Sequence, residues 1–524
     1  METLQRIIEE TTDAFVATLN KGDDDFLQIE EDLMRKMKIR IGQVNQAMTK
    51  GETRLSMPKH LSNNQIAKIL NAVKTIKVVT DRDNDDTRIL AIYNGEIYET
   101  DTEQLDRIAL KLNEALTQKD LQEINNRLYL YCEKQSINKD RNLIAVGNGI
   151  FNYETKALMP FSEDHVFLSK SIVNYNPNAK LKTFADGWNI ENWIDDIAID
   201  SDVSNLLWEV MSAILRPYVK WNKSVWLYST SGNNGKGTFC ELLRNLLGPK
   251  AHTSIPLSDF GKEFTLGPLI GKQAVIVDEN DVGTYIDKAG TLKAIITGDI
   301  ISINQKYKQP INYRFQGMMI QCLNEYPKVK DKSDSFYRRQ IFIPFNKCFT
   351  GHENKNIKAQ YLKDPDVLEY IMYKVLQTDF YELSEPASCK NALESYKEAN
   401  DPVRQFWSEF ESQFAWDLLP YKFLYELYKA WYEQNYPRGQ VVAKPSFEDA
   451  LRTMIIRESQ IWTCDPDPKK RIRSGSRMTQ PEPLIIEYQL KNWYSKTYQG
   501  VDAMKKCKLT NADLADNYTG VLRK

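Results

Sequence analysis

Hydrophobic and polar residues alternate along this chain in two rhythms, which predict helices at both ends and a sheet between them. Within residues 1–75, apolar positions recur every three or four residues, most clearly in 63–76, so this extension is predicted to be helical. Strand-like runs and a further helical stretch follow in 76–185, which predicts an α+β module. Inside it, 143–161 holds two apolar runs around an Asn-Gly turn, the pattern of a β-hairpin.

Four short apolar runs in 186–355 are separated by stretches with helical spacing. This alternation is typical of an α/β layer with a mostly parallel sheet. The runs are 224–228, 273–279, 317–325 and 340–345. Residues 356–395 are predicted to form a helical connector. The last region, 396–524, combines three helical stretches with two strand-like runs, 461–464 and 484–490, around a basic loop.

Composition restricts the function only in part. Of 524 residues, 69 are Lys or Arg and 71 are Asp or Glu, so the chain as a whole is not a polycation, although nucleic-acid binding depends on where the charge lies. Seven cysteines and four histidines are dispersed without a C-x-x-C pair, which argues against a zinc site or disulfide framework and favours a reducing compartment. We find no uncharged apolar run of about 18 residues and no secretion signal, and therefore expect a cytoplasmic protein without membrane contact.

The most informative stretch, 224–248, is an apolar strand, a Gly/Asn-rich loop and a helix in that order. Glycines let backbone N–H groups face a β-phosphate, the helix start adds a favourable dipole, and Lys236 supplies a mobile cation for the β- and γ-phosphates. Thr230 stands where the first glycine of G-x-x-x-x-G-K-[ST] would be, and Gly237 replaces its hydroxyl residue. A Gly/Asn turn before a surface helix is the alternative. The predicted ATP-binding residues are Gly232, Asn233, Asn234, Gly235, Lys236, Gly237 and Thr238.

Two further strands end in polar residues that an NTPase needs. One ends at Asp278-Glu279, and open α/β sheets bind ligands at the carboxyl ends of their strands. At this distance from the loop, Asp278 is expected to orient Mg²⁺, with the Thr238 hydroxyl nearby, and Glu279 to polarise the attacking water. Asn324, on another strand end, is a candidate for holding that water and sensing the γ-phosphate. Capping of a turn before Pro327 is the alternative for Asn324.

Two adjacent arginines, Arg338 and Arg339, stand just before the last apolar run. An exposed guanidinium there suits an arginine finger that reaches the γ-phosphate of a neighbouring subunit, because arginine stays charged and its fork fits phosphate oxygens. Surface ion pairs are the alternative, and the sequence does not distinguish which arginine would act.

A predicted hairpin lies between the acid pair and Asn324, where two β-rich runs flank Lys306, Tyr307 and Lys308. In a ring of subunits such tips would line the pore, with lysine gripping phosphates and tyrosine stacking on sugar or base. On a monomeric enzyme the same tip would be a solvated loop.

The C-terminal region carries an excess of positive charge, with 14 Lys or Arg against 8 Asp or Glu in residues 451–524. Ser446 and Asp449 form a candidate capping box for the predicted recognition helix. A basic loop after three helices suits duplex DNA binding through phosphates and a groove, and a solvated basic loop is the alternative. The candidate DNA-binding residues are Lys469, Lys470, Arg471, Arg473 and Arg477.

With these motifs in order, the chain resembles the superfamily 3 helicases, specifically the helicase part of phage and plasmid primase-helicases and of poxvirus-type primase-helicases. The matching segments are 232–239, 275–280, 292–307 and 322–345, with 146–161 and 172–179 upstream and 400–407 and 421–435 downstream. The resemblance implies an AAA+ P-loop ATPase core in a hexameric ring, hydrolysis of Mg-ATP at subunit interfaces, and a C-terminal winged-helix domain. About 80 residues precede the resembling part, so we expect no primase domain in this chain.

The resulting prediction is an ATP-dependent replicative DNA helicase of a phage or other mobile genetic element, in a bacterial host. Its expected partners are single-stranded DNA, duplex origin DNA bound through 396–524, further copies of the chain, and a separate primase or host replication proteins. One alternative is an origin-binding initiator whose ATPase controls assembly. A second is a P-loop nucleotide kinase, which the chain length, the paired arginines and the lysine hairpin disfavour.

Overall fold

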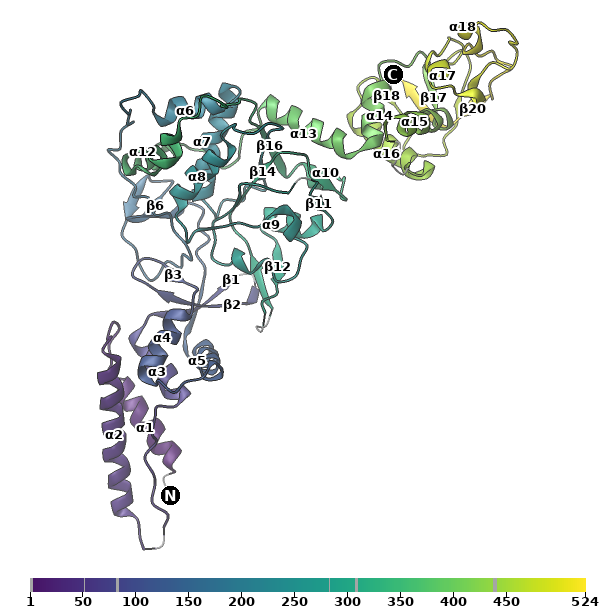
Figure 1. Ribbon diagram of the computed structural model, residues 1–524. Coiled ribbons are helices and arrows are strands. Elements are labelled where there is room, and N and C mark those ends of the chain that lie inside the picture. The colour runs from purple at the N-terminus through teal and green to yellow at the C-terminus, as the bar shows by residue number, and fades with distance from the viewer. Residues whose placement is uncertain (1–2, 51, 82–83, 282, 307–309, 437–440) are drawn as a thin grey trace. The chain divides into compact units, whose positions relative to one another are not determined.

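The computed structural model describes residues 3–50, 52–81, 84–281, 283–306, 310–436 and 441–524. The chain divides into two compact units, Met1–Ala392 and Leu393–Lys524 (Figure 1). Among the described residues, none of the helices has the length and apolar character that crossing a bilayer requires.

Three helices open the first unit, as the apolar spacing predicts. They are α1 (Leu4–Val16), α2 (Phe26–Ala47) and α3 (Asn63–Val73). Each starts at a residue whose side chain accepts a backbone N–H of the first turn, namely Thr3, Asp25 and Ser62, and such caps satisfy donors that would otherwise lack partners. The buried faces of these helices share one core with the sheet that follows.

A small mixed sheet follows the helices, with the strand order β3-β2-β1-β4. Its elements are β1 (Ile76–Asp81), β2 (Asn84–Tyr93), β3 (Tyr98–Glu99), α4 (Glu103–Leu112), α5 (Gln118–Tyr131) and β4 (Glu133–Ser136). Strand β1 pairs antiparallel with β2 and parallel with β4. The parallel pair is possible because α4 and α5 return the chain to the start of the sheet.

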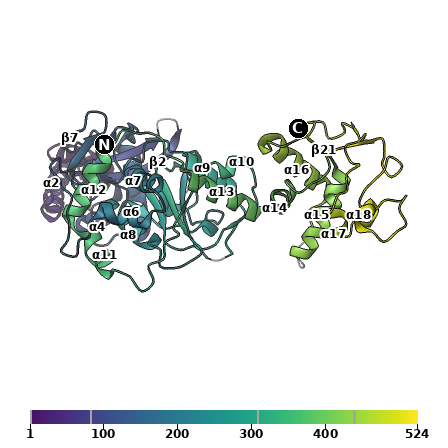
Figure 2. The same cartoon turned by 90° about the horizontal axis from the view of Figure 1, so that it is seen from above.

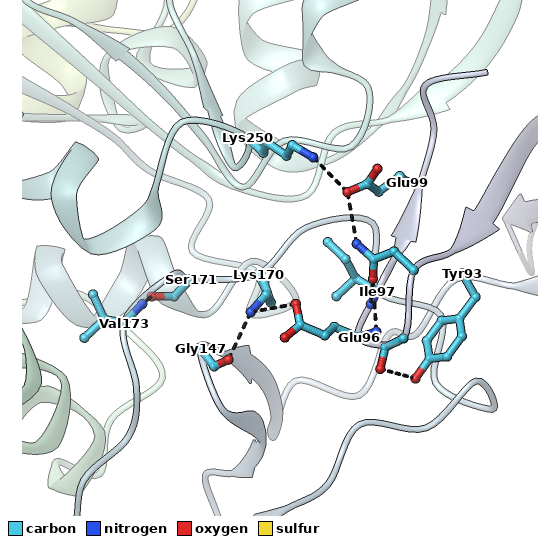
Figure 3. A network of polar contacts seen from close by, with 11 residues as sticks. Tyr93, Glu96, Ile97, Glu99, Gly147, Lys170, Ser171, Val173 and Lys250 are labelled. Atoms are coloured by element: carbon cyan, nitrogen blue, oxygen red, sulfur yellow. Dashed lines mark hydrogen bonds and ion pairs between the residues drawn. The ribbon is translucent and has the colours of Figure 1, made fainter. Parts of the chain in front are cut away.

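The predicted hairpin is confirmed as three antiparallel strands, β5 (Leu143–Val146), β6 (Gly149–Asn152) and β7 (Ala157–Met159). Ion pairs tie this region and the larger sheet domain to the small mixed sheet (Figure 3). Lys250 bonds Glu99 of β3 at 2.8 Å, and Lys170 bonds both Glu96 and the Gly147 carbonyl oxygen at 3.0 Å.

The predicted parallel sheet is confirmed as five strands in the order β16-β8-β14-β10-β9. They are β8 (Ser224–Tyr228), β9 (His252–Thr253), β10 (Ala274–Val277), β14 (Met318–Leu323) and β16 (Gln340–Pro344), and every neighbouring pair runs parallel. Strand β14 therefore lies between β8 and β10 although it follows both in the chain. Except for the short edge strand β9, the strands are buried on both faces, which explains their nearly continuous apolar sequences.

One face of this sheet packs against a group of helices, seen together in Figures 1 and 2. The helices are α6 (Ile190–Ile197), α7 (Ser201–Leu215), α8 (Lys236–Leu247) and α12 (Pro365–Gln377). Alternate strand residues such as Val225, Ile276 and Ile320 enter the core that these helices share, because successive side chains of a strand point to opposite faces. Helix α8 ends at Gly248, whose positive φ of 81° makes it the expected C-cap.

Smaller elements complete the first unit. They are η1 (Leu257–Asp259), η2 (Gly267–Leu269), β11 (Tyr285–Ile286), α9 (Ala289–Thr297), β12 (Ile300–Ile303), β13 (Ile311–Arg314), β15 (Lys328–Val329), α10 (Asp334–Tyr337), α11 (Lys355–Ala359) and η3 (Tyr361–Lys363). Strands β12 and β13 pair antiparallel, which confirms the predicted hairpin. Its predicted tip residues Tyr307 and Lys308 lie outside the described residues, and Lys306 is exposed.

The second unit begins within α13 (Ala387–Asn400). Its further elements are α14 (Pro402–Phe410), β17 (Leu418–Pro420), α15 (Tyr421–Asn435), α16 (Lys444–Glu458), β18 (Trp462–Thr463), β19 (Ile472–Arg473), α17 (Leu484–Glu487), η4 (Lys491–Trp493), α18 (Ala503–Lys506), β20 (Asn517–Tyr518) and β21 (Gly520–Arg523). Strand β21 pairs antiparallel with β17 on one side and β18 on the other. Aromatic side chains, including Trp416, Tyr428 and Trp462, fill its core.

Two local predictions for this unit are wrong. The run 484–490 is not a strand: it forms the short helix α17, which follows Pro483, and adjacent Leu484 and Ile485 are both buried, which an alternating strand does not allow. The capping box of Ser446 and Asp449 does not form, because α16 begins two residues earlier with Pro445 in its first turn. Proline is favourable there since its fixed φ suits a helix start.

Candidate functional site

Three of the predicted site segments meet at the carboxyl edge of the parallel sheet. The loop 229–235, predicted to bind phosphate and called the phosphate loop below, follows β8, Asn324 follows β14, and Asp278-Glu279 follow β10. Leu323 pairs with Tyr228, and Val277 pairs with Gln321, so the three strand ends lie side by side. Because parallel strands end at one edge, the loop, the acid pair and Asn324 line one site.

The loop before α8 is shaped by its own residues. Asn233 and Gly235 adopt positive φ values of 52° and 88°, which turn successive N–H groups the same way. A Cβ on Gly235 would lie 3.2 Å from the Ile197 side chain, in addition to the strained backbone, so this position requires glycine.

The buried side chain of Asn234 holds this loop in shape by three hydrogen bonds, which are together called the brace below. Its amide nitrogen donates to the Ser229 hydroxyl at 2.6 Å and to the Ser231 carbonyl oxygen at 2.5 Å. Its carbonyl oxygen accepts from the Lys236 amino group at 3.0 Å. One side chain thus connects the beginning of the loop to the first residue of α8, a connection that the loop's turn-forming composition did not predict.

Lys236 occupies the first position of α8 and is only 6% exposed. Burial lowers the pKa of its amino group, since the charged form loses solvation there. A charged group held at a helix start beside uncommitted backbone N–H groups is suited to an anion such as a phosphate. Thr238 is partly exposed in the first turn of the helix, and space is open around Gly237.

The acid pair is exposed at the end of β10, but Asp278 already has a partner. Arg244 of α8 donates to its carboxylate at 2.8 Å and also reaches the Ile276 carbonyl oxygen at 3.3 Å. This contact uses one carboxylate oxygen and holds Asp278 against the helix that follows the phosphate loop. The next residue, Asn280, is buried and donates to Gln321 and the Cys322 carbonyl oxygen, which fixes the end of β10 against β14.

The two arginines lie at the opposite edge of the sheet, because they precede β16 whereas the loop follows β8. Lys223 donates to the Arg338 carbonyl oxygen, and Ser224 donates to that of Arg339. The guanidinium of Arg339 is partly buried and donates to the Ser335 carbonyl oxygen, whereas Arg338 is exposed. A strand of five residues, about 17 Å, separates them from the phosphate loop of the same chain.

The hairpin β12–β13 is anchored at its base rather than isolated. Arg314, at the end of β13, bonds Asp81 of the small mixed sheet at 3.1 Å and the Gly298 carbonyl oxygen at 3.0 Å. Asp81 is 6% exposed and also pairs with Lys139. The base of the hairpin is therefore connected by buried charges to the elements that precede the parallel sheet.

Beside the phosphate loop lies a cavity of about 470 Å³. Asn233, Gly235 and Thr238 form one wall, and the aromatic side chains Trp188, Trp193 and Phe349 form others. The remaining lining residues are Asn189, Asn192, Asp196, His352, Glu353, Asn354, Ile357 and Lys358. Sequence reasoning missed this cavity because its walls come from segments more than 100 residues apart.

Residues after β16 hold the outer side of the loop. The Phe349 N–H donates to the Asn233 carbonyl oxygen at 2.8 Å, and the Asn233 amide donates to Thr350 and Glu353. The mixture of flat apolar rings and hydrogen-bonding groups beside a phosphate-sized loop suits a nucleoside.

In the second unit, the five predicted basic residues are all exposed. Lys469, Lys470, Arg471, Arg473 and Arg477 lie between β18 and α17, around the short pair of β19 and β20. In helix α16, the predicted recognition helix, Arg452 pairs with Asp449 and Lys444 with Glu448, both within the helix. Positive charge in this unit is therefore concentrated outside that helix.

Three stretches of the chain match known protein families. Residues 112–199 match the family described as D5 N terminal like, 227–339 match a family of unknown function (DUF5906), and 398–477 match the family described as Poxvirus D5 protein-like. The two D5 matches support a relationship with D5-like primase-helicases. The middle stretch, 227–339, contains the phosphate loop, the acid pair and the arginines. Because the family that it matches has no described function, the chemistry of this part is argued from its geometry alone.

One related protein is described as "Putative helicase L207/L206" from Acanthamoeba polyphaga mimivirus, with 25% identity over 234 residues. The match covers 43% of this chain and 24% of the viral protein, so the aligned part spans about a quarter of that relative. Among solved structures, the apo A form of the NrS-1 C-terminal region is similar at 13% identity and a TM-score of 0.42, covering 89% of this chain and 99% of that one. A second apo structure of that region has a TM-score of 0.41 at 13% identity, covering 80% and 98%.

Proposed function

We propose that this chain is an ATP-hydrolysing DNA helicase of a D5-like replication system, with a superfamily 3 AAA+ core. The observation that carries the proposal is the carboxyl edge of the parallel sheet, where the phosphate loop, Asn324 and Asp278-Glu279 converge. The position of β14 between β8 and β10 brings Asn324 between the loop and the acid pair. The D5-like matches and the mimivirus relative support nucleic-acid unwinding as the use of that site.

In this proposal each group has one task. Lys236 and the loop N–H groups bind the β- and γ-phosphates, and the aromatic cavity takes the nucleoside. Glu279, exposed at the strand end, orients the attacking water and Asn324 positions it. Mg²⁺, when bound, would neutralise phosphate charge, and the oxygen donors of Asp278 and Thr238 fit this hard cation.

We further propose that hydrolysis requires a neighbouring copy of the chain, in a homo-oligomeric ring that the resemblance to superfamily 3 implies to be a hexamer. The support is the distance between the arginines and the phosphate loop, which lie at opposite edges of one sheet. Arg338, exposed and held only through its backbone by Lys223, is the better candidate for the finger, since the Arg339 guanidinium is engaged by Ser335. Lys306 and its hairpin neighbours would then contact single-stranded DNA.

The second unit is proposed to be a winged-helix domain that binds duplex DNA. Two features support this assignment. The elements follow in the order helix, strand, two helices, strand, long insertion and strand, and β21 lies between β17 and β18 in the sheet. The exposed cations 469–477 belong to the insertion, where a wing would be. An initiator role at an origin, with a separate primase as a partner, is compatible with this domain.

Two variants test the catalytic proposal. Lys236→Ala should abolish nucleotide binding, ATP hydrolysis and unwinding together, whereas Glu279→Gln should keep nucleotide binding and lose hydrolysis. The measurements are equilibrium binding of a fluorescent ATP analogue and phosphate release with and without single-stranded DNA. Lys262→Ala, an exposed lysine outside the site, serves as the control. Substantial hydrolysis by Lys236→Ala would exclude this site.

Removal of residues 396–524 tests the second unit. Duplex binding should weaken, because the exposed cations 469–477 are removed, while ATP hydrolysis remains, because the two units have separate cores. Unchanged duplex binding by the shortened chain would exclude the winged-helix assignment.

A further inference from the structure

Charge is strongly segregated along helix α2 and the segment that follows it. Residues 23–32 contain six Asp or Glu and no Lys or Arg. Residues 35–60 then contain seven Lys or Arg and one acid, Glu52, in a chain whose net charge is −2. The seven cations, called the basic strip below, are Arg35, Lys36, Lys38, Arg40, Lys50, Arg54 and Lys59.

The fold presents the basic strip on one elongated element. All seven of its residues are exposed, whereas Ile29, Leu33, Met37 and Ile41 form the buried face of α2. The following segment runs back beside the helix, because Asn45 exchanges two hydrogen bonds with the Leu55 backbone, at 2.9 and 2.8 Å. The cations of the following segment therefore lie beside the carboxyl half of α2, together with those of the helix itself.

Helix stability does not account for this charge. Cations stabilise a helix through its dipole only within the last turn, and the last turn of α2 contains none. Local contacts do exist within the strip: Arg35 bonds Asp32, and the Lys36 amino group lies 4.7 Å from the centre of the Phe15 ring. Such exposed contacts contribute little to stability, so they do not explain seven cations in 26 residues.

We propose that the basic strip is a docking surface for the sugar-phosphate backbone of nucleic acid, separate from the nucleotide site and from the basic residues of the second unit. From residue 35 to the end of α2 the helix extends about 18 Å, which matches about five phosphates of one strand. A membrane surface fits less well, because interfacial helices expose a continuous apolar face, whereas the apolar face of α2 is buried and its exposed large apolar side chains, Leu27 and Ile39, lie about three turns apart.

The test uses the full chain with Lys38→Gln, Arg40→Gln and Lys50→Gln combined. Binding of labelled single-stranded, duplex and forked DNA is measured by fluorescence anisotropy over a range of salt concentrations, without nucleotide. The slope of log affinity against log salt should fall by about 2 for a single strand or about 2.7 for a duplex, if all three cations contact phosphate. The arm that responds identifies which form of nucleic acid the strip binds.

A matched control carries Lys119→Gln, Lys134→Gln and Lys180→Gln, three exposed lysines elsewhere in the first unit. Its slope should stay that of the unsubstituted chain. The single variant Lys38→Gln, with a slope lower by at most about 0.9, supplies the result if the triple variant unfolds.

Binding of the same variants to phosphatidylserine vesicles is measured as well. Three outcomes would overturn the proposal: unchanged slopes in every DNA arm, equal loss in the control, or a loss confined to the vesicles. Because no nucleotide is present, each of these outcomes leaves the proposed ATPase site untouched. A failed ATPase test would likewise leave this surface standing.

Discussion

The brace formed by Asn234 leads to a quantitative prediction for Asn234→Ala. The substitution removes the donor to Ser229 and Ser231 and the acceptor of Lys236. Asn234 is 3% exposed, so water does not simply replace the lost amide. The Ser229 hydroxyl and the Ser231 carbonyl oxygen, left without this donor, each cost about 1 kcal/mol, or about 2 kcal/mol together; Lys236 is not counted, because in the proposal bound phosphate replaces its lost partner.

This free energy is lost from the ordered loop rather than from the sheet beneath it. If the loop must hold this shape to bind phosphates, about 2 kcal/mol corresponds to roughly 30-fold weaker apparent affinity for ATP. The midpoint of thermal unfolding should change little, because the loop lies at the sheet edge and its opening does not require the core to unfold.

The assay is calorimetric or fluorescent titration with ATP, alongside thermal unfolding of the same samples. Asn222→Gly is the matched control, since glycine keeps the positive φ and only an exposed hydrogen bond to the Lys220 carbonyl oxygen is lost, outside the site, so its ATP affinity should be that of the unsubstituted chain. If Asn234→Ala bound ATP as tightly as the control variant, the brace would not shape the site.

Two other predictions concern the opposite sheet edge and the second unit. Arg338→Ala should keep ATP binding and reduce hydrolysis by about 10³-fold, the usual contribution of an arginine finger. Arg339→Ala should mainly lower thermal stability. Full hydrolysis by Arg338→Ala would assign the finger to another residue. Burial alone would raise the pKa of Asp513, but hydrogen bonds from Thr510, Lys496 and Ser495 lower that pKa to about 2. The contribution of Asp513 to stability is therefore present above about pH 4 and disappears as pH falls toward 2. Asp513→Asn should destabilise the second unit at neutral pH but not below pH 2, which urea unfolding at the two pH values measures. Equal losses of stability at both pH values would contradict this.

Local patterns predicted the parts of the site that depend on chain order. The run from β8 through the glycines to α8 could be predicted because strand, turn and helix each have a local signature. The placement of Asn324 and Asp278 at the same edge followed from the rule that parallel strands end together. The five-strand order agrees with that reasoning, since β14 lies beside both β8 and β10.

Contacts between distant segments could not be predicted in the same way. Nothing in the local sequence indicates that Arg244 would hold Asp278, or that Trp188 and Phe349 would line one cavity with the phosphate loop. The basic strip was visible in the sequence, but its significance depends on the return segment that pairs with α2. The run 484–490 was wrongly predicted as a strand, because its β-branched residues can also form a helix when a proline precedes them and their side chains pack into a core.

Strand β8 also has a mechanical consequence. Its carboxyl end leads into the phosphate loop, and residues at its amino end hold the backbone of both arginines. Flanked by β16 and β14 and fully packed, it behaves as a stiff rod, since protein interiors compress little. The backbone of the phosphate loop and the backbone of the arginines are thus attached to opposite ends of one rigid strand, so their separation of about 17 Å within one chain is fixed.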